Sequence, residues 1–220
     1  MKASDDPLTR RLAALYASAV HDVLRALSDK PCALPAELRP LDPRLKIAGR
    51  TWPFAGRHDP SATAHDVLLA WATVLSQAPA DHVLVCQPND RNIALMGELS
   101  AETLQQRGGL GYVVDGGCRD TDFILELGYP VFHRFFTPTD VVTSHWLATG
   151  LGEPVRIGEV DIHAGDYILG DRDGVVVIPS ALAADVITQT EAVASTESSI
   201  RDALRSGMDP VQAYLKYRKF

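Results

Sequence analysis

The residues from about 81 to 136 alternate between short apolar runs and helical segments, and this alternation constrains the fold more than any other feature. The apolar runs read "DHVLVCQ", "LGYVVDGG" and "YPVFHRFF". Between them we expect a helix from about Ile93 to Arg107, stopped by Gly108 and Gly109, and a short helix "RDTDFILELG" closed by Gly128. A β-α-β-α-β order of this kind predicts a parallel sheet with right-handed crossovers.

The residues before this segment predict two further helices and a strand. Apolar residues at helical spacing predict an N-terminal helix over about 8–29. "LKIAGRTWPFAG" predicts a strand interrupted or edged by Pro53. "SATAHDVLLAWATVLSQA" predicts a helix with Ser61 as its N-cap.

The second half changes character. "PVRIGEVDIHAGDYILGDRDGVVVIP" has short β runs with turn residues at close spacing, which predicts a β-rich layer. A long C-terminal helix follows over about 180–206, with Ser180 as its cap and Gly207 as its stop. No internal repeat or low-complexity linker is visible, so we expect one α/β domain over residues 1–220.

Composition and charge exclude several classes of protein. No run of about 18 apolar residues is present, and the polar N-terminal "MKASDDPLTRRL" lacks the apolar core of a secretory signal. The net charge is -7 with no dense Lys/Arg block, which disfavours nucleic-acid binding. The three cysteines show no CxxC spacing and fit a reducing compartment. We therefore expect a cytoplasmic protein without a membrane span or a nucleic-acid partner.

Charged residues follow the predicted parallel strands at positions where ligands bind. Glu98 lies on the helix after one strand, and Arg119 and Asp120 follow the next strand. Since the carboxyl ends of parallel strands share one edge of a sheet, we expect these side chains to converge. The alternative is a purely structural role, in which the Arg-Asp pair is a helix cap with a solvated charge.

These residue types suit a metal and an anionic substrate. Asp120 is a hard oxygen ligand of the kind that Mg²⁺ or Mn²⁺ accepts, and Glu98 could hold one of the metal's waters. Arg119 offers a planar fork for a carboxylate or an enolate oxygen. Backbone N–H groups from Gly97 to Ser100 could receive a carboxylate at a helix N-terminus. Together they predict a site for a 2-oxo acid.

Glu98, twenty intervening residues and then Arg119-Asp120 form an element that resembles a known family signature. The chain is similar to the 4-hydroxy-4-methyl-2-oxoglutarate/4-carboxy-4-hydroxy-2-oxoadipate aldolases and to the related regulator of ribonuclease activity A. "VHDVLRAL", "GYPVFHRFFTPTD" and "GEVDIHAGDYILGDRDGVVVIP" agree with this resemblance, which extends from about residue 15 to 207. It implies a layered, swivelling β/β/α-type fold in homotrimers or homohexamers, with sites between subunits.

The resemblance also implies a role for each site residue. Asp120 would ligate the divalent metal directly, and Arg119 would lie against the pyruvyl keto or enolate oxygen. Glu98 would orient a metal-bound water, and amides around Leu99 and Ser100 would bind the substrate. Glu197, from the last helix of a neighbouring subunit, would complete the water shell.

Two stretches depart from the family pattern. His21 precedes Asp22, where the family often has a small or hydroxyl residue, and "RFFTPTDVVTSHWLATG" is bulkier and more aromatic than usual. Both departures concern the distal half of the substrate and not the metal end. Among other residues, Cys118 is expected to be a buried filler and not a reactive thiol, and Asp171 and Asp173 to form a turn. His145 beside Trp146 could line a pocket or pack a loop.

The resemblance implies a class II pyruvate aldolase that cleaves 4-hydroxy-2-oxo dicarboxylates or tricarboxylates, with oxaloacetate decarboxylase side activity. Two alternatives stay open. One is a protein-binding regulator of ribonuclease activity. The other is a sugar-acid lyase or dehydratase that uses the same enolate chemistry.

Overall fold

A mixed eight-stranded sheet forms the centre of the molecule in the computed structural model, which describes residues 4–219. Its strands run in the order β1-β6-β4-β3-β2-β11-β12, and β8 pairs with the far end of β2. Their bounds are β1 Arg39–Pro40, β2 Ile47–His58, β3 His82–Gln87, β4 Gly111–Val114, β6 Val131–His133, β8 Trp146–Thr149, β11 Tyr167–Asp171 and β12 Gly174–Ile178. The strands β2, β3, β4 and β6 are mutually parallel, which confirms the predicted parallel segment.

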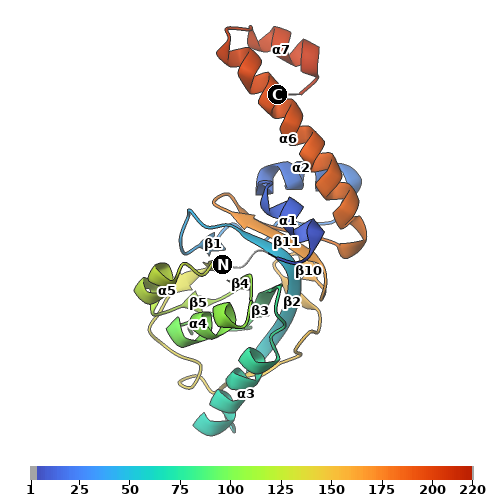
Figure 1. Cartoon of the computed structure of the whole chain (residues 1–220). Helices are drawn as coiled ribbons and strands as arrows, with labels where there is room; N and C mark the ends of the chain where they lie inside the picture. Colours follow the sequence, from blue (N-terminus) through green and yellow to red (C-terminus); the bar gives the residue numbers. More distant parts are fainter. Residues whose placement is uncertain (1–3, 220) are drawn as a thin grey trace.

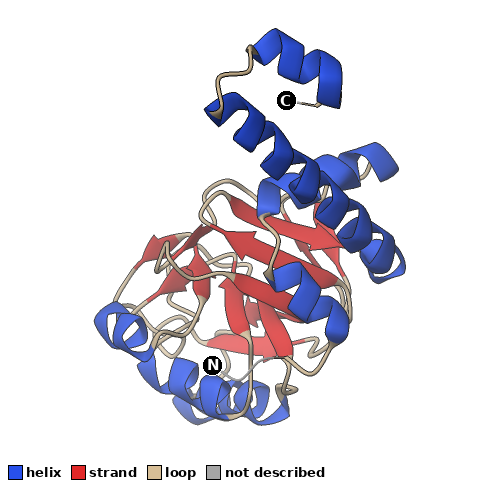
Figure 2. Ribbon diagram, turned by 45° about the horizontal axis from the view of Figure 1, so that its top comes forward, coloured by secondary structure: helices blue, strands red, loops and turns tan. Residues whose placement is uncertain are grey.

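Helices cover both sides of the strands, as Figure 2 shows. On one side lie α3 (Ala64–Gln77), α4 (Glu98–Gln106) and α5 (Thr121–Leu127) (Figure 1). In the chain they follow β2, β3 and the short strand β5 (Gly117–Cys118). Alternate residues of one strand face opposite ways, because side chains in a strand have a period of two. In β3, Leu84 and Cys86 join the core with these helices, whereas Val83 and Val85 join a second core.

The second core lies under a small β layer. The hairpin of β9 (Val155–Ile157) and β10 (Val160–Ile162) is antiparallel and buries its valines and isoleucines against the sheet. With β11 and β12 it forms the β-rich half that the sequence predicts. A third core joins the sheet to the terminal helices α1 (Pro7–Ala13), α2 (Ala17–Leu27) and α6 (Ala183–Arg205).

The strand β2 is 12 residues long and continues through Pro53, which lies in its middle. Along one edge, β2 pairs with β11 up to Arg50 and with β8 from Ala55 onward. Pro53 therefore lies between two partners at a point where no ladder bond needs its missing N–H. The strand is not interrupted, because the proline falls in this gap.

The single N-terminal helix expected over about 8–29 is instead two helices, α1 (Pro7–Ala13) and α2 (Ala17–Leu27). Tyr16 between them has extended backbone angles, and Lys46 donates a hydrogen bond to the carbonyl of Leu15. The Asp171 carboxylate accepts from the N–H of Ala17, the first residue of α2. Apolar spacing runs on across the break, so periodicity alone does not reveal it.

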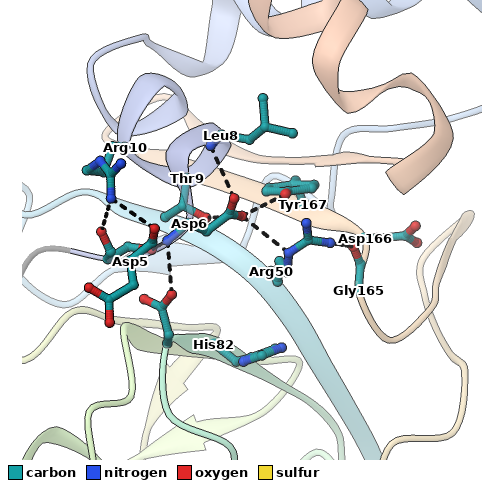
Figure 3. Close-up of polar contacts among 12 residues, drawn as sticks. Asp5, Asp6, Leu8, Thr9, Arg10, Arg50, His82, Gly165, Asp166 and Tyr167 are labelled. Atoms are coloured by element: carbon teal, nitrogen blue, oxygen red, sulfur yellow. Dashed lines mark hydrogen bonds and ion pairs between the residues drawn. The ribbon is translucent and has the colours of Figure 1, made fainter.

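A polar cluster around Asp6 attaches α1 to the sheet (Figure 3). Its carboxylate accepts hydrogen bonds from the hydroxyl of Tyr167 at 2.6 Å and from the N–H of Leu8 at 3.2 Å. The Arg50 guanidinium lies 3.2 Å from the same carboxylate and over the Tyr167 ring. Asp6 thus caps the helix and ties it to β2 and β11.

Helix starts differ from expectation at three other places. The cap of α3 is Thr63, which forms a capping box with Asp66, and not Ser61. Helix α4 begins at Glu98, and not near Ile93. At the C-terminal helix, Ser180 lies in a 3₁₀ turn (Ser180–Leu182) and caps nothing, and α6 follows as Ala183–Arg205. The predicted stops at Gly108, Gly128 and Gly207 all adopt positive φ.

The far half of α6 projects from the body of the molecule, and α7 (Pro210–Tyr217) folds back beside it (Figure 1). Helix α7 was not expected, although Asp209 and Pro210 are a helix-start signal that caps it. Across residues 4–219, no helix is long and apolar enough to cross a membrane.

Candidate active site

Two backbone segments that precede α4 and α5 run side by side and bring the predicted site residues together. The N–H of Leu95 donates to the carbonyl of Gly117 at 2.9 Å, and the N–H of Arg119 donates to the carbonyl of Met96 at 2.9 Å. A Cβ on Gly117 would lie 2.6 Å from the carbonyl oxygen of Ile93, so only glycine permits this approach. The bridge fixes the start of α4 beside Arg119 and Asp120.

Asp120 is the centre of the site. Its Oδ2 accepts a hydrogen bond from the backbone N–H of Glu98 at 3.2 Å and lies 3.4 Å from Nε of Arg119. The residue adopts a left-handed backbone conformation, with φ 53° and ψ 37°, which is uncommon outside glycine. Asp120 occupies the N-cap position of α5, but its side chain makes no capping hydrogen bond there, and its carboxylate accepts from the first N–H of α4 instead. The side-chain cap of the alternative interpretation is therefore not formed, whereas both charged side chains are partly exposed, at 38% each.

Gly97 is the N-cap of α4 and lies against this carboxylate. A Cβ on Gly97 would be 2.6 Å from Oδ2 of Asp120, although its extended backbone, with φ −146°, would accept any residue. A side chain at position 97 would therefore displace the Asp120 carboxylate, and space rather than backbone angle favours glycine here.

Arg119 lies between two carboxylates. Besides Asp120, its Nη1 lies 3.6 Å from Oδ2 of Asp140. The backbone N–H of Thr143 holds the pKa of Asp140 below its usual range, and the charge of Arg119 acts in the same direction. Asp140 was not among the predicted site residues. Its signal in the sequence is only "TPTD", a turn that shows no periodicity.

A cavity of about 450 Å³ lies over these groups. It is lined by all of the predicted residues on this side, namely Gly97, Glu98, Leu99, Ser100, Arg119 and Asp120, and also by Asp140. In the described part of the chain, no hydrogen bond reaches the backbone N–H groups of Leu99 and Ser100. Such free amides in the first turn of a helix are donors for an anion.

Asp120 has the chemistry for a divalent cation. Among residues 4–219, no hydrogen bond reaches its Oδ1, and the side chain is 38% exposed. No group of three or more His, Cys, Asp or Glu side chains converges as a metal site within those residues. A cation here would therefore have one protein carboxylate and water as its ligands, a pattern typical of Mg²⁺.

Glu197 does not line this cavity in the same chain. It lies on α6, where its carboxylate accepts a hydrogen bond from Tyr16 and pairs with Lys219 at 2.9 Å. A role for Glu197 would require a second subunit.

The other residues singled out in the sequence have structural roles. Burial raises the pKa of Cys118 to about 12, so it is a filler and not a reactive thiol. His145 Nδ1 lies 2.8 Å from the carbonyl of Ala62, and buried Trp146 donates to the carbonyl of Pro88. The Asp171 carboxylate accepts from the N–H of Asp173, which confirms the predicted turn.

A second cavity, of about 510 Å³, lies between α2 and the β9-β10 hairpin. Among its charged groups, Arg156 pairs with Asp161, and the buried Asp166 accepts from the N–H groups of His163 and Ser180. The cavity beside Asp120 is the candidate active site, because the predicted site residues line it.

A family model described as RraA-like, Aldolase/RraA, matches residues 17–177. This range contains every site residue described above except Glu197. The chain belongs to the RraA-like family. The resemblance seen in the Glu98 and Arg119-Asp120 element is thereby confirmed.

Relatives of this RraA-like chain carry different names. It is 29% identical to a protein of Halalkalibacterium halodurans named "Putative 4-hydroxy-4-methyl-2-oxoglutarate aldolase", over 69% of this chain and 71% of that one. It is 28% identical to Protein DlpA of Legionella pneumophila over 82% of this chain, but the match spans only 29% of that protein. A protein of Ectopseudomonas mendocina with the same name is 34% identical over 40% of this chain and 54% of its own length.

Solved structures share the fold. A protein of Pseudomonas syringae superposes with a TM-score of 0.86 over 99% of both chains, at 23% identity. Streptomyces coelicolor RraAS2, described as an unusual member of the RNase ES inhibitor RraA family, superposes with a TM-score of 0.80 at 25% identity, over 91% of this chain and 98% of its own. The layered α/β fold with a long C-terminal helix is thus confirmed.

Proposed function

We propose that this RraA-like protein is a divalent-metal-dependent carbon–carbon lyase, a class II aldolase that releases pyruvate from 4-hydroxy-2-oxo acids. The names of its relatives suggest the dicarboxylate 4-hydroxy-4-methyl-2-oxoglutarate as the first substrate to test, and the family resemblance adds related tricarboxylates. The observation that carries the proposal is the meeting of Asp120, Arg119 and two free helix amides in one cavity.

Each group has a distinct task in this proposal. The amides of Leu99 and Ser100 bind the substrate carboxylate. Arg119, held by Asp120 and Asp140, directs its guanidinium to the 2-oxo oxygen, where negative charge develops as the C3–C4 bond breaks. Asp120 would hold Mg²⁺ or Mn²⁺, which supplies a Lewis acid for the same oxygen.

Glu98 is the general base for the proton of the C4 hydroxyl. Glu98 lines the cavity, and among the described residues no cation pairs with its carboxylate. Through a water molecule it takes the proton of the C4 hydroxyl, the electrons of the C3–C4 bond pass to the pyruvyl fragment, and a proton then returns to C3. Loss of carbon dioxide from oxaloacetate gives the same fragment, so oxaloacetate decarboxylation is proposed as a side activity.

The experiment measures pyruvate release from 4-hydroxy-4-methyl-2-oxoglutarate, other 4-hydroxy-2-oxo acids and oxaloacetate. Protein treated with EDTA is assayed with and without added Mg²⁺ or Mn²⁺, and the uncatalysed decay of oxaloacetate is subtracted. We expect turnover only with metal. An equal rate in EDTA would rule out the proposed mechanism.

The likeness to RraAS2 favours a second candidate, a regulator that binds a ribonuclease. Such a role needs an exposed binding surface, and Leu99 and Phe136 near the cavity are 76% and 64% exposed. Co-purification with an RNA-degradation enzyme, together with no pyruvate release from any substrate tested, would favour the regulator over the lyase.

A further inference from the structure

The cavity beside Asp120 is lined by a polar group of residues around Arg119 and by an apolar wall. Helix α3 contributes a single face to this wall, since its lining residues recur at intervals of three and four. Two valines of the loop before β8 also line the cavity. The apolar wall consists of Leu68, Trp71, Ala72 and Leu75 from α3 with Val141 and Val142.

The charges around the cavity are unbalanced. Arg119 is the single cation among the described residues that line it, whereas Glu98, Asp120 and Asp140 are three carboxylates. Both Asp120 and Asp140 already lie beside Arg119, at 3.4 and 3.6 Å. The substrate carboxylate would have the helix amides and Arg119 as partners. Apart from Thr103 of α4, the described lining residues away from these groups are apolar and include no cation, so a second carboxylate among them would lack a charged partner.

Such a second carboxylate is unfavourable for two reasons. It would gain no charged partner for the water that it loses at the partly exposed α3 face. Arg119 and a divalent cation on Asp120 would together only balance the three carboxylates, so no net positive charge would attract it. An alkyl or aryl group at the same place would instead bury apolar surface against α3.

The apolar wall is fixed before any ligand binds. Trp71 donates a hydrogen bond from Nε1 to Oγ of Ser100 at 2.9 Å, and its ring contacts Phe54 and Trp146 at centroid distances of 6.3 and 6.1 Å. These contacts fix the indole beside the α4 amides. A preformed apolar surface loses little entropy on binding and favours a ligand of matching polarity.

We infer that the preferred substrate is a 2-oxo monocarboxylic acid whose far end is an alkyl or aryl group, and that the α3 face selects against dicarboxylates. This inference rests on the proposed function, because it assumes that the 2-oxo acid carboxylate binds at the α4 amides. It limits the proposed substrates to monocarboxylic acids, whereas the names of the relatives point to a dicarboxylate.

The test compares two ligands that differ only in charge at the far end. Isothermal titration calorimetry with Mg²⁺ present measures the affinity for 5-methyl-2-oxohexanoate and for 2-oxoglutarate, in which a carboxylate replaces the isopropyl group. We expect the apolar acid to bind at least about tenfold more tightly, the difference that about 1.4 kcal/mol produces.

A pair of variants locates the selectivity on α3. Leu68 lines the cavity and Leu69 does not, and both are more than half exposed, at 55% and 57%. Leu68→Arg adds a cation beside the far end of the ligand and is expected to raise the affinity for 2-oxoglutarate about five- to tenfold. Leu69→Arg is the matched control and is expected to change neither affinity by more than about twofold.

Tighter or equal binding of 2-oxoglutarate by the unmodified protein would overturn the inference. So would equal effects of the two arginine variants. If neither acid binds, the cavity is not a 2-oxo acid site, and both the inference and the proposed function are contradicted. Selective binding of the apolar acid without pyruvate release from any 4-hydroxy-2-oxo acid would contradict the lyase proposal alone.

Discussion

At the scale of single residues, the two oxygens of Asp120 are in different environments. Oδ2 is engaged by the N–H of Glu98 and by Arg119, and Oδ1 receives no hydrogen bond from residues 4–219. Asp120→Asn keeps the shape but removes the negative charge. We expect pyruvate release with Mg²⁺ to fall by about 100-fold or more. Asp122→Asn, an exposed neighbour on α5, is the control and should retain the activity.

Gly97 gives a second prediction at this scale. In Gly97→Ala the added Cβ would lie 2.6 Å from Oδ2 of Asp120, so the carboxylate must move away from the Glu98 amide. Since the backbone at position 97 is extended, we expect catalysis to fall by about tenfold or more while the thermal midpoint changes by only a few degrees. Unchanged kcat and KM in this variant would contradict the geometry of the site.

Which site residues can be read from the sequence depends on how their positions are set. Glu98, Arg119 and Asp120 follow predicted parallel strands, so topology alone indicates that they converge. Asp140 lies in a loop without periodicity, and it reaches Arg119 only through the path of that loop. Trp71 appears in the sequence as one apolar residue of a helix, and nothing local reveals its bond to Ser100.

At the scale of elements, the start of α4 shows why helix boundaries are hard to predict. Ile93 to Met96 are apolar at a spacing that fits a helix, but Ala94 forms a bridge with Gly117 and Leu95 bonds to the same residue. Tertiary pairing outweighs the local preference there, and the helix begins only after Gly97. The misplaced start matters, because the free amides of α4 are those of the true first turn.

The attachment of α1 predicts a dependence of stability on pH. Burial alone would raise the pKa of Asp6, but hydrogen bonds from Tyr167, Leu8 and Thr9 and the charge of Arg50 lower it overall. A carboxyl whose pKa is lowered by folding stabilises the native state above its unfolded pKa, about 3.9, and loses this contribution as pH falls through the folded value.

We therefore expect Asp6→Asn to reduce the free energy of unfolding by about 1–2 kcal/mol at pH 7, and by less at pH 3. Urea unfolding at the two pH values measures this difference. A destabilisation that is as large at pH 3 as at pH 7 would show that the charge of Asp6 is not what holds α1 to the sheet.

At the scale of the whole molecule, helix α7 has an apolar stripe, formed by Val211, Tyr214 and Leu215, that the described part of the chain leaves largely exposed. Val211, Tyr214 and Leu215 recur at spacings of three and four, and all are about half exposed or more. A second copy of the chain would bury them, in line with the trimer or hexamer implied by the family resemblance. In such an assembly Glu197 of α6 could reach a neighbour's site.

We expect light scattering on the purified protein to give three or six copies per particle. Leu215→Asp places a charge in the stripe and should shift the distribution toward smaller particles while the circular dichroism spectrum is retained. Wild-type protein that is monomeric at micromolar concentration would contradict both the assembly and the role proposed for Glu197.

The central claim is that Asp120 is the protein's direct ligand to a divalent cation. Titration with Mn²⁺, followed by the loss of the free-ion electron paramagnetic resonance signal, measures this without any substrate. We predict one site per chain in the wild-type protein and in Asp122→Asn, and affinity at least about 100-fold weaker in Asp120→Asn. Equal Mn²⁺ affinity in Asp120→Asn, or no binding by the wild-type protein, would contradict the account.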